Sequence, residues 1–264
     1  MPFFSSTVTA LILLAIVAIS GSLQAQSARS LQQSLSIGAY YAVGDYGEPE
    51  NTEIDYFPVS YAANIGQWGF QLLVPRLAVT GLGNVLVNIG GLTRAVAGTK
   101  RVTERGTGDV VATLTYRFEP ESTESAFFDV RMDVKFPTAN ASKNLGTGET
   151  DFSIQLDMSK NVANNVVFAT IGHNFRGKSE LYPGLEDGTF LQLGMARPVR
   201  ASWSVGVFYD YRQAASDFSD ESHELVPYFT WQLSERWSFT GLTSVGFTNA
   251  SADHSVMGQL NYQW

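Results

Sequence analysis

The chain contains no cysteine. A disulfide framework, a thiolate nucleophile and a thiolate metal site are therefore excluded. Charged residues make up only 16% of the 264 residues, and the net charge is −8. Nucleic-acid binding depends on clustered Lys and Arg side chains that neutralise phosphates, and the sequence has no such cluster. The charge balance therefore argues against a nucleic-acid partner.

Long apolar runs are equally scarce. The only one extends from Val8 to Ile19, which is shorter than the ~20 residues that a membrane-spanning helix needs. Together with the Leu23-Gln24-Ala25 segment, it predicts a signal peptide over residues 1–25 with cleavage after Ala25. An uncleaved membrane anchor is the alternative. Because no later segment could form a transmembrane helix, membrane insertion of residues 26–264 would require a closed β-barrel.

What the chain has in quantity is an alternation of apolar and polar residues. Between Phe128 and Phe136 every second residue is apolar and the residues between are charged. The same period of two recurs about every twenty residues, and the last strand ends on the aromatic Trp264, as in a barrel whose final strand is anchored at the lipid–water boundary. The predicted strands are 34–43, 53–63, 67–77, 109–118, 126–137, 150–159, 166–175, 189–196, 202–212, 223–233, 237–248 and 255–264.

The connections between these strands alternate in length. Short turns are predicted at 64–66, 119–125, 160–165, 197–201 and 234–236. Mostly longer loops are predicted at 44–52, 78–108, 138–149, 176–188, 213–222 and 249–254. This alternation is typical of outer-membrane barrels, with short turns in the periplasm and long loops outside the cell. We therefore predict an all-β, up-and-down antiparallel transmembrane β-barrel of about twelve strands, with fourteen as the alternative where the alternation is blurred.

One stretch resembles a known family. The segment MDVKFPTANASKNLGTGETDFSIQLD, from Met132 to Asp157, is similar to outer-membrane barrels named for the meta-pathway of phenol degradation. The segment that begins at Gly106 and the closing residues 258–264 are similar too, although Ala139 stands where the family commonly has glycine. The resemblance covers roughly residues 106–264. It implies passage of hydrophobic or aromatic compounds across the outer membrane, and it implies no particular functional residue.

Two groups of residues are candidates for solute contact. The first is a set of charges on the predicted inner face, which could set the selectivity of a pore or could pair across strands and fill a closed barrel. Its members are Arg117, Asp129, Arg131, Asp133, Lys135, Asp151, Asp157, Asp210 and Arg212. The second is an apolar loop from 77 to 98, which either folds into the barrel mouth as an apolar binding surface or extends the neighbouring strands or adds a hairpin. Its candidates are Leu82, Val85, Leu86, Val87, Ile89 and Leu92.

Catalysis and cofactor binding have little support. The histidines lie far apart, and the sequence pairs Ser222-His223 and His254-Ser255 place each serine and histidine on opposite faces of a strand. Such pairs cannot act as nucleophile and base. The segment Gly146 to Glu149 lacks the Lys of a phosphate-binding loop and reads as a turn. We therefore expect no enzyme activity, no metal and no cofactor.

These observations together predict an outer-membrane channel that passes small hydrophobic or aromatic solutes by passive diffusion. The alternatives are a structural or adhesive barrel with a filled lumen and, less favoured, a lipid-modifying enzyme. The expected partners are outer-membrane lipid and lipopolysaccharide, small apolar solutes, and the barrel-assembly machinery, which would read the C-terminal strand ending in Trp264.

Overall fold

The structure is a computed structural model. It describes residues 31–264 apart from 47–48, 83–84, 89–90, 95–100, 121, 123–124 and 217–218. The predicted signal peptide at 1–25 lies outside the described residues. In β4 and β5 only the backbone is described, so most side chains of the predicted apolar loop lie outside the description as well. No helix in the described part of the chain is long and apolar enough to cross a bilayer.

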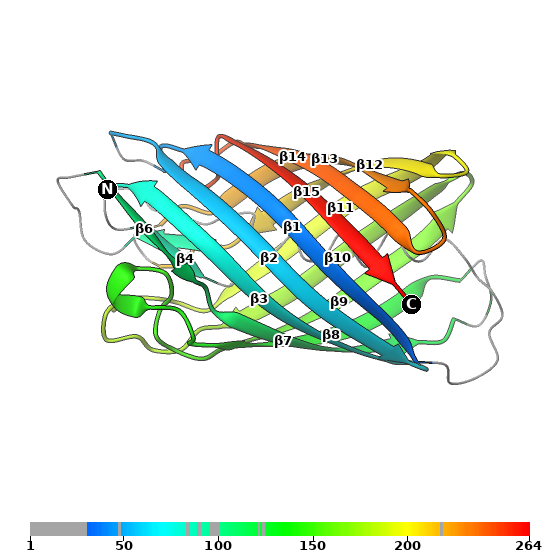
Figure 1. Cartoon of the computed structure of the whole chain (residues 1–264), viewed down its shortest axis with the longest axis horizontal. Coiled ribbons are helices and arrows are strands. Elements are labelled where there is room, and N and C mark those ends of the chain that lie inside the picture. The colour runs from blue at the N-terminus through cyan, green and yellow to red at the C-terminus, as the bar shows by residue number, and fades with distance from the viewer. Residues whose placement is uncertain are drawn as a thin grey trace.

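The described strands form a closed antiparallel barrel (Figure 1). Its strands are β1 (Gln32–Gly44), β2 (Thr52–Ile65), β3 (Trp68–Gly81), β6 (Val102–Thr107), β7 (Val110–Phe118), β8 (Phe127–Phe136), β9 (Asp151–Val162), β10 (Asn165–Phe175), β11 (Gly188–Arg200), β12 (Trp203–Arg212), β13 (Ser222–Gln232), β14 (Trp237–Gly246) and β15 (His254–Gln263). Apart from β6 and β7, strands that are neighbours in this order pair with each other, and β1 closes the barrel against β15. β6 and β7 pair with different parts of β3, so together they occupy one strand position in the wall. Counted in this way, the described barrel is twelve strands around.

The twelve predicted strands are confirmed, whereas the alternative of fourteen is wrong. The predicted loop 78–108 is also partly wrong, because β3 continues to Gly81 and β6 pairs with it. Within β6, Glu104 and Arg105 put polar side chains on both faces, so the alternation that marks a lipid-facing strand is missing there. The rest of this loop contains a short hairpin of β4 (Val85–Asn88) and β5 (Gly91–Arg94).

The outer and inner faces of the wall differ in polarity, as the alternation predicts. On β8, Met132 is 44% exposed on the outside, while its neighbours Arg131 and Asp133 are 3% and 6% exposed on the inside. The large exposed hydrophobic side chains recur in the same way around the barrel. A belt of exposed apolar side chains around the whole barrel is unfavourable in water and favourable in contact with lipid tails. The outer face therefore fits a membrane environment.

All five tryptophans of the chain lie at the end of the barrel that carries the short turns. Trp203 stacks on Trp231 across β12 and β13, with ring centroids 4.9 Å apart. Trp237 packs against Tyr262 at 4.7 Å. Trp68 and Trp264 lie at the same end, where β3 begins and β15 ends. Tryptophan prefers the boundary between lipid and headgroups, so this ring marks one membrane interface.

Aromatic rings lie over glycines on neighbouring strands. Gly206 pairs directly with Tyr228, and a Cβ atom on the glycine would lie 2.4 Å from the tyrosine ring. Gly172 and Phe190 form a similar pair, with 2.2 Å between the Cβ position and the ring. A ring that covers a glycine replaces the missing side chain and fixes the register of both strands. Glycine is therefore required at these positions for packing.

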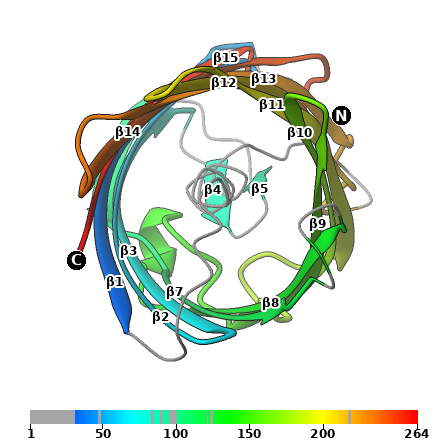
Figure 2. The ribbon, with the colours of Figure 1, turned by 90° about the vertical axis from the view of Figure 1, so that its right-hand side faces the viewer.

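Loops at the opposite end fold inward. Figure 2, viewed along the barrel, shows the 3₁₀ helix η1 (Ala141–Lys143) and the loop 176–187 inside the ring of strands. The hairpin β4–β5 also lies within the ring in this view. In Figure 1 these segments are at the end away from the C-terminus. We call this the long-loop end, and the other the short-turn end.

Candidate functional site: the barrel lumen

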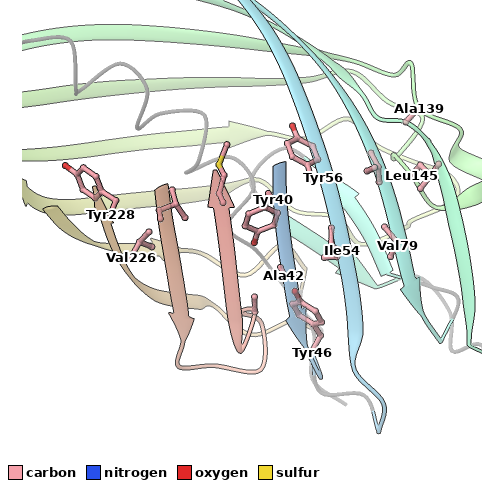
Figure 3. Packing of buried hydrophobic residues seen from close by; sticks show 14 of the residues in the cluster. Tyr40, Ala42, Tyr46, Ile54, Tyr56, Val79, Ala139, Leu145, Val226 and Tyr228 are labelled. Atoms are coloured by element: carbon pink, nitrogen blue, oxygen red, sulfur yellow. The ribbon is translucent and has the colours of Figure 1, made fainter. Parts of the chain in front are cut away.

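The inner wall is divided into an apolar sector and a charged sector. The apolar sector lies on strands β12 to β15 and β1 to β3. In Figure 3 its side chains point to one side of these strands, from Tyr228 on β13 across to Val79 on β3. Members of this sector are Tyr40, Ala42, Ile54, Tyr56, Leu77, Val79, Phe208, Val226, Tyr228, Leu242 and Met257. All of them are buried and belong to one packing cluster, and buried polar side chains such as Ser60, Glu224 and Ser244 lie on the same strands.

The charged sector lies opposite, on β7 to β12. It contains all nine charges that the sequence predicts for the inner face, and each has a partner. Arg212 Nε donates to Asp210 Oδ2 at 2.8 Å, and both side chains are almost fully buried. Arg131 Nε lies 3.3 Å from Asp133 Oδ1 on the same strand. A polar side chain inside a barrel costs least when paired in this way.

The remaining charges of this sector are also satisfied. Arg117 Nε lies 3.7 Å from Asp129 Oδ2 across β7 and β8, at a partly exposed position. Asp157 accepts hydrogen bonds from Gln155 Nε2 and Thr170 Oγ1. The nine charges are four cations and five carboxylates, so both signs are mixed within the sector, and a role in selectivity stays a prediction.

At the long-loop end, Lys135 is the centre of a buried ion cluster. Its Nζ lies 2.9 Å from Asp151 Oδ2 and 3.1 Å from Asp109 Oδ2, and it donates to Thr147 Oγ1 at 2.7 Å. The lysine side chain is 0% exposed. Asp151 Oδ1 in turn accepts the backbone N–H of Gly177 at 2.8 Å. One lysine therefore ties the wall to both inward-folded loops.

Apolar contacts hold loop 137–150 in the same place. Leu145 is 1% exposed and belongs to the same buried cluster as Leu77 and Val79 on β3. Asp109 Oδ1 accepts the N–H of Ala139 at 2.9 Å. The loop is thereby packed on the inner side of β3, where it narrows the long-loop end. Its turn after Thr138 contains Ala139, the position at which the sequence departs from the family that it resembles.

Three buried polar residues lie outside the set that the sequence predicts for the inner face. Asp109 lies at the break between β6 and β7, and its partner is on another strand. Glu224 is 0% exposed inside the barrel mouth. Tyr46, in the loop after β1, is also fully buried, and this burial, with nearby Glu224, raises the pKa of its phenol well above the ordinary 10.0. The signal that could have found them is the position of each residue beside a predicted strand end.

The histidines do not form a catalytic arrangement with their neighbouring serines. Ser222 lies on the inner face, where its Oγ is 3.0 Å from Ser251 Oγ. His223 lies on the outer face, with Nδ1 hydrogen-bonded to the Tyr209 hydroxyl. Its Nε2 lies 3.5 Å from the exposed Glu221 carboxylate. The opposite orientation predicted for adjacent residues is confirmed at this pair. Among the described residues, no group of three or more His, Asp or Glu side chains could hold a metal ion.

A recess opens on the lumen side of β15, β1, β2 and β3. Half of its lining is apolar and half polar. The apolar residues are Tyr56, Pro58, Leu73 and Met257, and the polar ones are Ser36, Ser60, Gln71 and Gln259. The recess lies in the apolar sector, facing the charged one.

Comparisons with known proteins identify the fold. The chain is similar to an outer-membrane channel from Pseudomonas putida F1, with a TM-score of 0.68 and 9% identity over 92% of this chain and 98% of that one. It is also similar to the NanC porin (TM-score 0.54, 6% identity, 86% and 97% covered). The translocator domain of the autotransporter NalP from Neisseria meningitidis follows, with a TM-score of 0.52 and 10% identity over 97% and 95% of the two chains.

No family model matches the chain, and no curated protein matches it either. The resemblance to barrels named for phenol degradation therefore stays a prediction. At identities near 10% the structural likeness shows the fold, that of an outer-membrane β-barrel of the kind used by channels and porins.

Proposed function

We propose that the protein is an outer-membrane channel through which small hydrophobic or aromatic solutes diffuse down their gradient. The observation that carries this proposal is the apolar sector inside the barrel. The cluster joins Tyr, Ile, Leu and Met side chains on the inner faces of neighbouring strands. For an apolar solute, contact with these side chains replaces unfavourable contact with water.

The charges of the lumen fit this proposal because both signs are mixed and each charge has an ion-pair or hydrogen-bond partner. Arg212 pairs with Asp210, and Lys135 offsets one of the two carboxylates beside it, Asp109 and Asp151, so the lumen carries no strong positive field. Such a lumen neither selects anions nor repels an uncharged aromatic molecule. The similar structures support the proposal through their fold, since they include an outer-membrane channel and a porin.

The experiment is single-channel recording from the refolded protein in a planar bilayer, with phenol or benzoate added. We expect a stable conductance that falls as phenol occupies the lumen. The variant Tyr40→Ala removes a side chain of the apolar sector and should weaken the block. Tyr41→Ala is the matched control, because the adjacent residue is 39% exposed on the lipid side. A correctly folded barrel with no conductance would contradict the proposal.

A structural barrel with a filled lumen is the second candidate, and the paired inner charges and inward-folded loops favour it. Silence in the bilayer together with high thermal stability would support it. The apolar loop stays a separate hypothesis, because its side chains lie outside the described residues. Deleting 82–98 tests it: lost folding with unchanged permeation in the folded fraction would exclude a gating role.

Location and partners follow from the same proposal. We place the short-turn end, with its tryptophan ring, at the periplasmic interface and the long-loop end among lipopolysaccharide. The C-terminal strand ends on Trp264, and Trp264 N donates to Gln33 O on β1 at 3.0 Å. This strand would be the one that the barrel-assembly machinery reads. Deleting Trp264 should slow assembly in cells, which heat-modifiable migration on gels would measure.

A further inference from the structure

The outer face of β2 and β3 changes from apolar to charged toward the long-loop end. From Trp68 to Val74 the outward side chains of β3 are large, apolar and exposed. The next outward residue is Arg76, which is also exposed. On β2 the change comes at the same height, because Phe57 pairs with Arg76 and the next outward residue is Asp55. The apolar belt therefore ends on these two strands at a group of charged side chains.

A second outward arginine stands beside the first. Arg105 on β6 pairs with Ala78, and Arg76 pairs with Thr107. Residues that pair directly across antiparallel strands share a face, so both arginines project outward, and as diagonal neighbours they are about 7–8 Å apart at the backbone. The intervening Gly106 faces the lumen, where a Cβ atom would meet the inward-folded loop. Because Ala78 carries only a methyl group, both guanidinium groups can reach one anion in front of it.

These two guanidinium groups have no acidic partner in the described part of the chain. No ion pair or hydrogen bond joins the side chain of Arg76 or Arg105 to another described residue. The outward acid Glu53 is already bound, since its Oε1 accepts a hydrogen bond from Arg101 Nη2 at 2.6 Å. Asp55 lies across Ala78 from Arg105. Three arginines thus stand against two carboxylates, and this patch has an excess of positive charge with unused donors.

The height of the patch places it at the far edge of the hydrocarbon layer. Trp68, on the same strand, belongs to the tryptophan ring that marks one membrane interface. From Trp68 to Ala78 the strand climbs about 26 Å along the barrel axis, for a rise of about 3.4 Å per residue and a tilt of about 40°. The apolar band of an outer-membrane barrel is about 25 Å tall. Arg105, directly opposite Ala78, therefore lies at the height of lipid headgroups, and Arg76 reaches the same height by extending its side chain.

We infer that the outer face of β2, β3 and β6 is a binding site for lipopolysaccharide, in which Arg76 and Arg105 hold a phosphate of its lipid anchor. A guanidinium group donates paired, charge-assisted hydrogen bonds to phosphate oxygens. The acyl chains of the same molecule lie on Phe57 and Val74, which are 48% and 42% exposed just beyond the arginines on the hydrocarbon side. This inference rests on the proposed orientation, with the long-loop end outside, and does not depend on conductance through the lumen.

Binding of lipid A, the phosphorylated anchor of lipopolysaccharide, to the folded barrel in detergent tests the site. Native mass spectrometry counts the bound lipids and gives their Kd. We expect Arg76→Ala combined with Arg105→Ala to weaken binding at least about tenfold, because hydrogen bonds to charged groups are lost. The matched control is Lys160→Ala with Arg197→Ala, which removes two outward positive charges at the short-turn end. This control should bind lipid A as the wild type does.

Two other lipids show what the site recognises. Lipid A without its phosphates should bind to the wild type as weakly as lipid A binds to the double variant. Phosphatidylglycerol should also bind at least about tenfold more weakly than lipid A, because its single phosphodiester carries less charge for the two arginines. If the double variant, folded by heat-modifiable migration, binds lipid A as tightly as the wild type, the site is refuted. If phosphatidylglycerol binds as tightly as lipid A, the assignment to lipopolysaccharide is refuted.

The orientation is tested separately, with single cysteines in a chain that has none of its own. Asn249→Cys lies in an exposed loop at the long-loop end, and Glu235→Cys lies in an exposed short turn. A membrane-impermeant maleimide added to intact cells should label only Asn249→Cys. Labelling of Glu235→Cys alone would refute the orientation, and the inference with it. A barrel that binds lipid A at these arginines but conducts nothing would refute the channel and leave the lipid site in place.

Discussion

Replacing Lys135 with methionine should release the inward-folded loops without unfolding the barrel. Lys135→Met keeps the length of the side chain and removes its charge. Asp109 and Asp151 are then left facing each other in a site where their side chains are only 7% and 3% exposed. Removing one partner from a buried ion cluster costs about 3 kcal/mol, because a buried charge is left uncompensated. The wall itself keeps its strand pairing, so the cost falls on the loops.

Trypsin measures this release, because Lys143 is partly exposed in the loop that Lys135 anchors. A cost of about 3 kcal/mol corresponds to an increase on the order of 100-fold in the population of open loops. Cleavage after Lys143 in the folded, membrane-inserted variant should rise accordingly. Lys135→Met combined with Asp151→Asn removes one of the uncompensated charges and should restore much of the protection.

The matched control is Lys160→Met, at an exposed position near the short-turn end of β9. This variant should digest as the wild type does. The reasoning is refuted if Lys135→Met, still folded by heat-modifiable migration, is cleaved at Lys143 no faster than the wild type. In that case the apolar contacts of Leu145 alone would hold the loop.

Three further outcomes are expected. Tyr46 is buried and its pKa is raised, so its contribution to stability is complete below pH 10.0 and is lost above it, where the phenol of the unfolded chain ionises. The Tyr46→Phe variant should therefore show a smaller fall in Tm between pH 8 and 11 than the wild type, measured by circular dichroism. An equal fall in the two proteins would contradict this. Gly206→Ala forces a Cβ to 2.4 Å from the Tyr228 ring and should cost about 1–3 kcal/mol in urea unfolding; an unchanged midpoint would show that the ring can move. Trp231→Ala removes the stack on Trp203 and should lower the free energy of unfolding in urea by at least about 1 kcal/mol. An unchanged free energy would show that this tryptophan pair does not stabilise the barrel.

The strands could be predicted because lipid imposes a period of two on them. From Phe128 to Phe136 the outer residues must be apolar and the inner ones are free to be charged, so the two faces separate in the sequence. Where lipid is absent, as at Glu104 and Arg105 of β6, nothing enforces the alternation, and the strand was missed. On β12 the inner face also carries an apolar residue, Phe208, which is 1% exposed inside the barrel.

The apolar sector of the lumen could not be predicted from the same pattern. In Tyr40-Tyr41 both residues are aromatic, so alternation cannot tell which one faces inward. The ion cluster of Lys135 depends on closure of the wall and on a loop that folds back, and neither is local in sequence. One signal was available in the loop 137–150, since Leu145 is an isolated large apolar residue among polar neighbours. A buried contact was the physical reason for it.

The confinement of all tryptophans to one rim determines what intrinsic fluorescence can report during refolding. A barrel that enters a bilayer with its loops leading keeps the short-turn end at the starting surface, so Trp203, Trp231 and Trp237 never cross the hydrocarbon. Their emission should shift once, on arrival at the headgroups, and then stay constant while the loops translocate. Time-resolved tryptophan fluorescence of the unmodified chain therefore reports when the barrel binds the membrane surface. A label in loop 137–150 is needed to report when the loops cross the bilayer.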